Sequence, residues 1–187
     1  MFGYQIIQEL AGVLTGEEVI ISSNGNISRQ VYHFLPRPQI YLRGSMGLAV
    51  PVGLGVALAK PMKKVLVIVG DGNLLMGLGS LATTAYLRPR NMRILILDNN
   101  EYATTGHQQT ASGILDYPQL LKGLGMPYIE PIKIEESIEE MRTKLERLMQ
   151  TDDLCALPSI IGNESPTLSN IPWHPEKIAA LQKQREN

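Results

Sequence analysis

The sequence is poor in cysteine, in long apolar runs and in excess charge, and each shortage excludes a class of protein. One cysteine, Cys155, among 187 residues cannot form an internal disulfide framework, which suits a reducing cytoplasm. No apolar run reaches about eighteen residues, and the first residues lack the basic and apolar regions of a secretory signal. The formal net charge is −1, with acids and bases interspersed. We therefore expect a soluble cytoplasmic domain that binds neither membrane nor nucleic acid.

Two short apolar segments indicate the fold class. Residues 65–69 (VLVIV) and 93–97 (RILIL) are rich in apolar and β-branched residues, which predicts strands buried on both faces of a parallel sheet. Residues 73–86 contain no proline and are rich in Leu, Ala and Met, so we expect a helix between the strands. Arg88-Pro89-Arg90 would end that helix. The segment is therefore predicted to be a βαβ unit.

The same alternation continues in both directions. We expect further helices at residues 2–14, 26–35, 50–59, 117–124 and 134–149, and further strands at residues 19–22, 39–42, 128–129 and 154–161. Pro158 would confine the last strand to a sheet edge. The sequence thus predicts a three-layer α/β/α fold with a mainly parallel sheet. It predicts a single domain over residues 1–187, with a core of about 1–161 and a proline-containing, partly helical arm of about 162–187.

Polar residues follow both central strands. Gly70-Asp71-Gly72-Asn73 comes after the first strand and Asn99-Asn100-Glu101-Tyr102 after the second. In open α/β sheets, ligands sit outside the carboxyl ends of the strands. Carboxylate, amide and carbonyl oxygens suit Mg²⁺, which is usually held by few protein groups together with phosphates and water. Each segment could be an ordinary turn, but their placement on either side of one helix favours a site for Mg²⁺ and a phosphorylated ligand.

A third glycine loop, Gly44-Ser45-Met46-Gly47, precedes these segments and follows the strand expected at residues 39–42. We expect its backbone to face the same ligand. Met46 could also be ordinary core filling. Gly53 and Gly55, in the small-residue helix that follows, are predicted to pack tightly against a neighbouring element.

These segments resemble the signature of thiamine diphosphate enzymes. The signature is Gly70-Asp71-Gly72, then 26 residues, then Asn99-Asn100, with the Gly44–Gly47 loop similar to the segment that bends the cofactor in that family. Residues 18–130 further resemble the beta subunits of sulfopyruvate decarboxylases and their phosphonopyruvate decarboxylase relatives. The resemblance implies thiamine diphosphate and Mg²⁺ as cofactors and a 2-oxo acid as substrate, sulfopyruvate being the first choice.

The resemblance also implies a role for individual residues. Mg²⁺ would be bound by the side chains of Asp71 and Asn100 and by the backbone carbonyl of Tyr102. The diphosphate would meet the Gly70–Asn73 turn, with N–H groups from Gly72 and Asn73. Further cofactor contacts are implied for the Gly44 carbonyl, for Ser45, for Met46 as an apolar wedge under the cofactor, and for Thr105.

The resemblance implies a partner chain as well. In the family, the glutamate that activates the cofactor lies on a separate pyrimidine-binding domain, and none of the glutamates here matches that motif. The glutamates without that motif include Glu17, Glu18, Glu101, Glu130 and Glu135. We therefore expect a separate alpha-type subunit and a hetero-oligomer with at least two copies of each chain.

Some residues and functions stay open at this level. His107, in a polar loop after the expected metal ligands, is the catalytic candidate, although a lone surface histidine can be structural. Arg29 and Arg43 are candidate cations for an anionic substrate. Residues 77–82 spell a dinucleotide fingerprint, but within the expected helix and not at a strand-to-helix turn. Phosphonopyruvate decarboxylation, acetolactate-synthase-like carboligation and a non-catalytic, cofactor-binding role remain alternatives.

Overall fold

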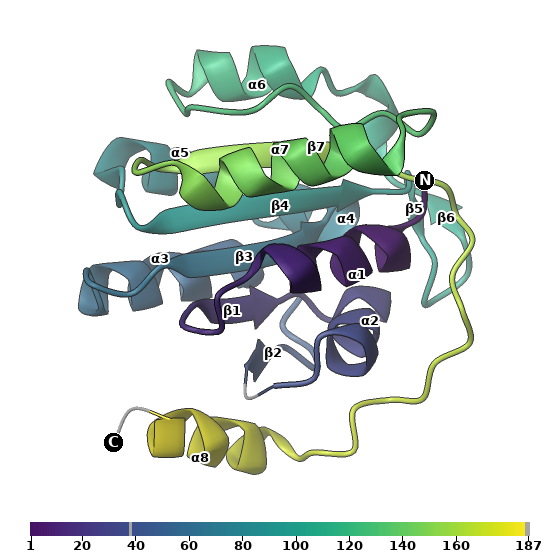
Figure 1. The fold of residues 1–187 in the computed structure, drawn as a ribbon. Coiled ribbons are helices and arrows are strands. Elements are labelled where there is room, and N and C mark those ends of the chain that lie inside the picture. Colours follow the sequence, from purple (N-terminus) through teal and green to yellow (C-terminus); the bar gives the residue numbers. More distant parts are fainter. Residues whose placement is uncertain (38, 186–187) are drawn as a thin grey trace.

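A computed structural model describes residues 1–37 and 39–185 and contains one central sheet of five parallel strands (Figure 1). The strand order is β2-β1-β3-β4-β7, so β3 lies at the centre. The parallel register of β3 and β4 pairs Val65 with Met92 and Gly70 with Leu97. The strands are β1 (Val19–Ser22), β2 (Ile40–Tyr41), β3 (Val65–Gly70), β4 (Met92–Asp98) and β7 (Cys155–Ile160).

Helices cover both faces of the sheet, which confirms the predicted three layers. Alternate residues of β3 point to opposite sides: Leu66 and Ile68 pack on one core, and Val67 and Val69 on the other. The first core is closed by α1 (Gly3–Val13), α2 (Asn26–Phe34) and α7 (Ile138–Gln150). The second is closed by α3 (Ala49–Ala59), α4 (Asp71–Met76), α5 (Leu78–Leu87) and α6 (Tyr117–Gly123).

The predicted helix over residues 73–86 is wrong in one respect, because the structure contains two helices with a break at Gly77. A Cβ atom on Gly77 would lie 2.2 Å from the carbonyl oxygen of Gly47, so the loop before α3 presses directly on this break. The cause is a contact between distant segments, and the local sequence does not reveal it.

Two other boundaries differ from the prediction. Residues 128–129 form no strand: Tyr128 makes only an isolated parallel bridge to Ala156. The helix expected from residue 134 begins at Ile138, because Ser137 caps it in a reciprocal capping box with Glu140. The remaining predicted elements lie within two residues of the observed ones.

Strand β7 occupies the sheet edge, as Pro158 predicts. Pro158 pairs with Ile96 of β4, and its carbonyl accepts a hydrogen bond from the N–H of Ile132 on the outer side. Because the N–H and C=O of one strand residue point the same way, the missing proline donor faces this outer side, where no strand follows.

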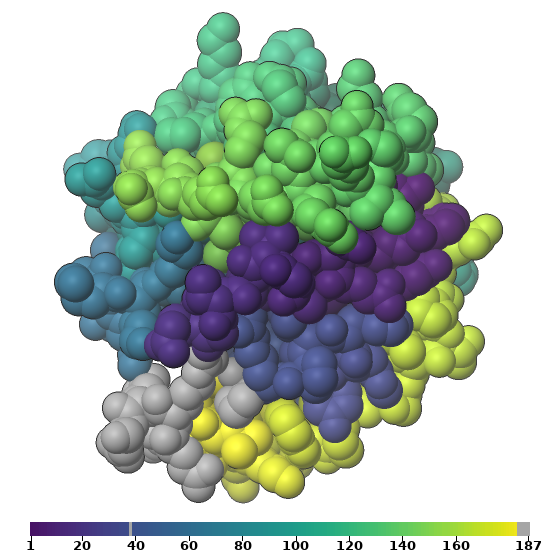
Figure 2. Space-filling view, viewed as in Figure 1, coloured from purple at the N-terminus to yellow at the C-terminus, as the bar shows by residue number. Residues whose placement is uncertain are grey.

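The C-terminal arm runs from the end of β7 along α2 and ends in α8 (Pro175–Arg185) beside β2. Trp173 packs edge-on against Tyr32 and Tyr41, with ring centroids 5.2 Å and 6.1 Å apart. Ile171 and Ile178 are buried in the same core. Figure 2 shows the arm lying at the surface next to α2.

A small antiparallel hairpin, β5 (Glu101–Tyr102) and β6 (Gln108–Gln109), follows β4 and leads into a 3-10 turn, η1 (Ala111–Ile114). Among the described residues, no helix is long and apolar enough to cross a bilayer.

Gly53 and Gly55 of α3 give a matched test of the packing. A Cβ on Gly53 would lie 2.2 Å from Val67 Cγ2, whereas nothing lies within 4 Å of one on Gly55. The prediction of tight packing is therefore right for Gly53 and wrong for Gly55.

We expect Gly53→Ala to lower the free energy of unfolding by about 1–3 kcal/mol through overpacking. Gly55→Ala should raise it by about 0.5–1 kcal/mol, because alanine is the better helix former. Urea unfolding of both variants measures the difference, and equal effects would contradict the observed packing of α3 on β3.

Candidate functional site

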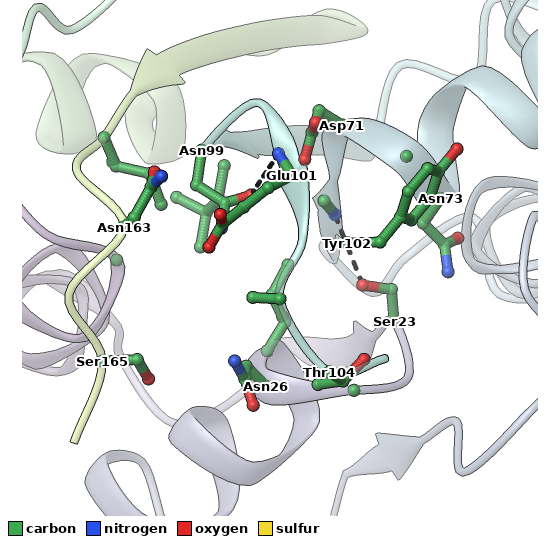
Figure 3. Close-up of a pocket in the computed structure, with 18 of the residues that line it drawn as sticks. Ser23, Asn26, Asp71, Asn73, Asn99, Glu101, Tyr102, Thr104, Asn163 and Ser165 are labelled. Carbon is green, nitrogen blue, oxygen red and sulfur yellow. Dashed lines mark hydrogen bonds between the residues drawn. The ribbon is translucent and has the colours of Figure 1, made fainter. Parts of the chain in front are cut away.

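The carboxyl ends of β1, β3 and β4 meet at one edge of the sheet and enclose a cleft, here called the strand-end cleft (Figure 3). Parallel register places these ends side by side. The walls come from five loops and from the starts of α1 and α2. The lining residues include Ser23, Asn24, Gly25, Asn26, Met46, Gly70, Asp71, Gly72, Asn73, Asn99, Glu101, Tyr102, Thr105, Gly162, Asn163, Glu164 and Ser165.

Asp71 is the buried carboxylate at the floor of the cleft, only 3% exposed. Its Oδ2 accepts hydrogen bonds from the Thr110 and Ser112 hydroxyls, at 2.5 Å and 3.1 Å. Burial raises the pKa of Asp71, hydrogen bonds lower it in part, and the charge of Asp98 raises it further. Burial and the charge of Asp98 both disfavour the ionised form of Asp71, and a bound cation would offset this cost.

Asn100 belongs to the same polar network. Its Oδ1 lies 3.1 Å from Ser112 Oγ and 3.5 Å from Thr110 Oγ1, the two hydroxyls that hold Asp71. Its backbone is left-handed, with φ at 57°, and its N–H donates to Asp98. The structure thus brings the two predicted metal-binding side chains together, although Asn100 does not line the cleft. Asn99, its neighbour, does.

Tyr102 and Gly72 approach each other closely across the cleft. A Cβ on Gly72 would lie 2.3 Å from the Tyr102 ring, so only glycine allows this contact. The Tyr102 carbonyl, the third predicted metal ligand, accepts hydrogen bonds within the β5–β6 turn from the N–H groups of Thr105, Gly106 and His107 and from the Thr105 hydroxyl. This oxygen is therefore engaged within the turn, and binding a metal ion would require some of these hydrogen bonds to break.

Asn73 links the Gly70–Asn73 turn to two other loops. Its Oδ1 accepts a hydrogen bond from Gly47 N at 3.1 Å, and its Nδ2 donates to Asn24 Oδ1 at 2.7 Å. The loop before α3 is thereby fixed beside the cleft, with Met46 facing into it. Gly44 and Ser45 are exposed and lie outside the cleft lining.

The hairpin after β4 carries the catalytic candidate. His107 is exposed, and its Nδ1 lies 3.0 Å from Oε1 of Glu101, which lines the cleft. Thr105 also lines the cleft, and its hydroxyl donates to Gln108 Oε1 at 3.0 Å. Arg43 donates to the backbone oxygen of Trp173, outside the cleft.

Sequence reasoning missed the loop that follows β1. Asn24, Gly25 and Asn26 line the cleft and open α2, whose Gly25 N-cap has φ at 84° and no side-chain cap. The first N–H groups of α2 therefore point to the same edge as those of α4. A polar Asn-Gly-Asn segment directly after a strand was the available signal. The arm residues Asn163 to Ser165 were missed too, and they carry no local signal.

The donor set fits a hard cation bound together with an anionic ligand. Across residues 1–37 and 39–185, no three side chains of His, Cys, Asp or Glu gather as a metal site. Within that part of the chain, no Lys, Arg or His forms an ion pair with Asp71. The predicted ligands are one carboxylate, Asp71, with amide oxygens and a carbonyl, the partial set that Mg²⁺ takes when phosphates complete its coordination.

Known proteins with similar sequences and folds agree with this chemistry. The family described as "Thiamine pyrophosphate enzyme, C-terminal TPP binding domain" matches residues 23–157. The chain is 39% identical over 142 residues to the sulfopyruvate decarboxylase subunit beta of Methanocaldococcus jannaschii, with 75% of each chain covered. It is 36% identical over 176 residues to a phosphonopyruvate decarboxylase of Streptomyces hygroscopicus, covering 94% of this chain and 40% of that protein.

The fold is also found in a solved structure. Benzoylformate decarboxylase from Polynucleobacter necessarius aligns with a TM-score of 0.73 at 16% identity, covering 90% of this chain and 34% of that one. At this identity, the similarity shows the fold alone.

Gly72→Ala tests the close approach of Tyr102. The added methyl group would push the ring and its backbone away from the metal-binding side of the cleft. We expect affinity for thiamine diphosphate with Mg²⁺ to fall by about tenfold or more, as for other residues that support metal ligands. Isothermal titration calorimetry measures the loss. Gly79→Ala is the control, because nothing lies within 4 Å of a Cβ there. Equal affinity of both variants would contradict the role given to Gly72.

Proposed function

Because the chain belongs to the thiamine pyrophosphate enzymes, whose C-terminal cofactor-binding domain it carries, we propose that it is the beta-type subunit of a 2-oxo acid decarboxylase. Its proposed substrate is sulfopyruvate, which would yield sulfoacetaldehyde and CO₂. The observation that carries this proposal is the alignment with the M. jannaschii beta subunit over 75% of both chains. The match over 94% of this chain supports phosphonopyruvate as the second candidate substrate.

The cleft residues divide between metal and diphosphate. Asp71, Asn100 and the Tyr102 carbonyl are the proposed Mg²⁺ ligands, with the Asn99 amide as a further candidate because it lines the cleft. The backbone N–H groups of Gly72 and Asn73 would donate to the diphosphate, because they lie in the first turn of α4. The first turn of α2 offers donors at the same place.

When bound, thiamine diphosphate supplies a carbanion that adds to the 2-oxo acid and then accepts the electrons left when CO₂ departs. The residues of this chain bind and orient it. Met46 would support the middle of the cofactor from the loop that Asn73 holds. His107 stays the candidate for a substrate contact from the hairpin, with Glu101 fixing its ring.

We further propose a separate alpha-type subunit that supplies the acidic residue facing the aminopyrimidine. Symmetric closure would give at least two copies of each chain. The longer phosphonopyruvate decarboxylase matches this chain over only 40% of its own length, which supports a missing complement of that kind. We also propose that residues 1–187 form a single cofactor-binding domain and that the protein acts in the cytoplasm.

An exposed apolar face next to the cleft supports the partner. Helix α3 carries apolar residues all around its axis, a pattern typical of fully buried helices. One side of it is nevertheless exposed to solvent. The face continues over α4 and α5, which contact α3. The large exposed side chains of these helices and of the loops at their ends are Leu48, Leu58, Met62, Met76, Tyr86 and Leu87. Of these, Met76 lies against Gly47, the neighbour of Met46 in the cleft wall. A partner on this face would border the open side of the cleft.

Met76→Lys tests this face. Met76 is 62% exposed, so we expect the variant to fold normally but to bind the alpha-type subunit at least about tenfold more weakly, because a charge replaces an apolar contact. Ile138→Lys is the control, since Ile138 is 52% exposed on α7 at the opposite side of the sheet. Binding of the two subunits can be measured by biolayer interferometry. Equal weakening by both variants would rule out this face as the specific interface.

The activity test uses the chain co-purified with the product of the adjacent reading frame. We expect decarboxylation of sulfopyruvate with thiamine diphosphate and Mg²⁺, and no turnover by the chain alone. Asp71→Ala should lower the affinity for the cofactor and Mg²⁺ by about 100-fold or more, beyond the loss typical of outer-shell partners. Robust turnover by the isolated chain would overturn the proposal that the active site is shared with a partner subunit. Product analysis with phosphonopyruvate and with pyruvate would identify phosphonopyruvate decarboxylation or acetolactate-synthase-like carboligation instead.

A further inference from the structure

Asp98, the last residue of β4, is a buried carboxylate with no part in the proposed function. It is 5% exposed, and three neutral donors lie within hydrogen-bond distance of it, one of them a hydroxyl shared with Asp71. Its Oδ1 accepts from Asn100 N and from Ser112 Oγ, each at 2.8 Å. Its Oδ2 accepts from the Tyr117 hydroxyl, also at 2.8 Å. Within the described part of the chain, no Lys, Arg or His forms an ion pair with it. A buried charge without a counter-ion calls for an explanation.

The sheet register brings Asp98 next to Asp71. Gly70 pairs with Leu97, so the two aspartates leave neighbouring strands at the same level. Ser112 Oγ lies 3.1 Å from Asp71 Oδ2 and 2.8 Å from Asp98 Oδ1. Because a hydroxyl carries one proton, it can donate to only one of these carboxylates at a time. The two acids therefore face each other across a shared hydroxyl group.

Asp98 also fixes the turn that carries both candidate asparagines. Asn100 has a left-handed backbone, which asparagine adopts more readily than most residues with a side chain, and its N–H donates to Asp98. Tyr117, buried at the start of α6, orients the carboxylate from behind. Burial and the negative charge of Asp98 raise the pKa of the Tyr117 hydroxyl, so it remains protonated and donates.

From this geometry we infer that Asp98 is a positioning residue of the metal site. It holds the Asn99–Asn100 turn and Ser112, and it supplies a second negative charge that attracts a divalent cation without binding it. The inference rests on the proposed function, in which Asp71 binds Mg²⁺.

The inference leads to opposite effects in the two states of the protein. Without a cation, the two carboxylates repel each other and destabilise the fold. With Mg²⁺ bound, the charge of Asp98 is favourable. A residue with a merely structural role would stabilise both states.

Asp98→Asn separates these effects. Its amide can still accept from Asn100 N and Ser112, and can donate to the Tyr117 oxygen, so the shape is kept while the charge is removed. Without ligands, we expect the midpoint of thermal unfolding to stay level or rise by about 2–4 °C. The dissociation constant for Mg²⁺, measured by calorimetry at saturating thiamine diphosphate with the partner present, should rise by about 10–100-fold.

Tyr117→Phe is the second variant. It keeps both carboxylates and removes the orienting hydroxyl group, so we expect a lower unfolding midpoint and a smaller loss of Mg²⁺ affinity than in Asp98→Asn. Unchanged affinity in Asp98→Asn, or a parallel loss of unfolding midpoint and affinity, would overturn the inference. An equal loss of affinity in both variants would also overturn the role of the charge. If the wild-type chain itself fails to bind Mg²⁺ and the cofactor, the proposed function fails instead.

Discussion

The site depends on one constraint, the parallel register of β3 and β4. Pairing Gly70 with Leu97 makes the two strands end at the same level. The next residues, Asp71 and Asp98, then lie side by side in a buried setting, where their side-chain partners among residues 1–37 and 39–185 are neutral hydroxyl and N–H donors. Two adjacent carboxylates under these conditions are unfavourable unless a cation lies near them. The fold therefore places two buried carboxylates at this edge of the sheet, and a bound metal ion would stabilise them.

Hydrogen bonds connect the neighbouring loops to the ends of these strands. Asn73 forms hydrogen bonds with both the loop before α3 and the loop after β1, which ties these two loops to the Gly70–Asn73 turn. The Ser28 hydroxyl of α2 lies 2.7 Å from the carbonyl oxygen of Ser23 and 3.0 Å from that of Leu42. It can donate to either one, which helps to hold the ends of β1 and β2 together. A site on loops joined in this way keeps the geometry that metal and diphosphate binding require.

Much of this could be predicted from the sequence, because strands buried on both faces and glycine-aspartate turns carry strong local signals. The strands around Val67 and Leu95, and Asp71 as the acidic residue between them, needed no knowledge of distant contacts. The break at Gly77 depends on the backbone of Gly47 pressing against it, and no local pattern records that contact. The cleft residues of the C-terminal arm, and the pairing of Asp98 with Asp71, likewise follow only from how distant segments meet.

The central claim is that a divalent ion at the ends of β3 and β4 joins Asp71 to the diphosphate of the cofactor. Mn²⁺ can replace Mg²⁺ and report on nearby phosphorus nuclei, so electron–nuclear double resonance of the Mn²⁺-loaded protein tests the claim directly. With thiamine diphosphate present, the account predicts strong ³¹P coupling, which disappears when Asp71 is replaced by alanine. Absence of ³¹P coupling in the wild-type protein, or its persistence in the variant, would contradict the account.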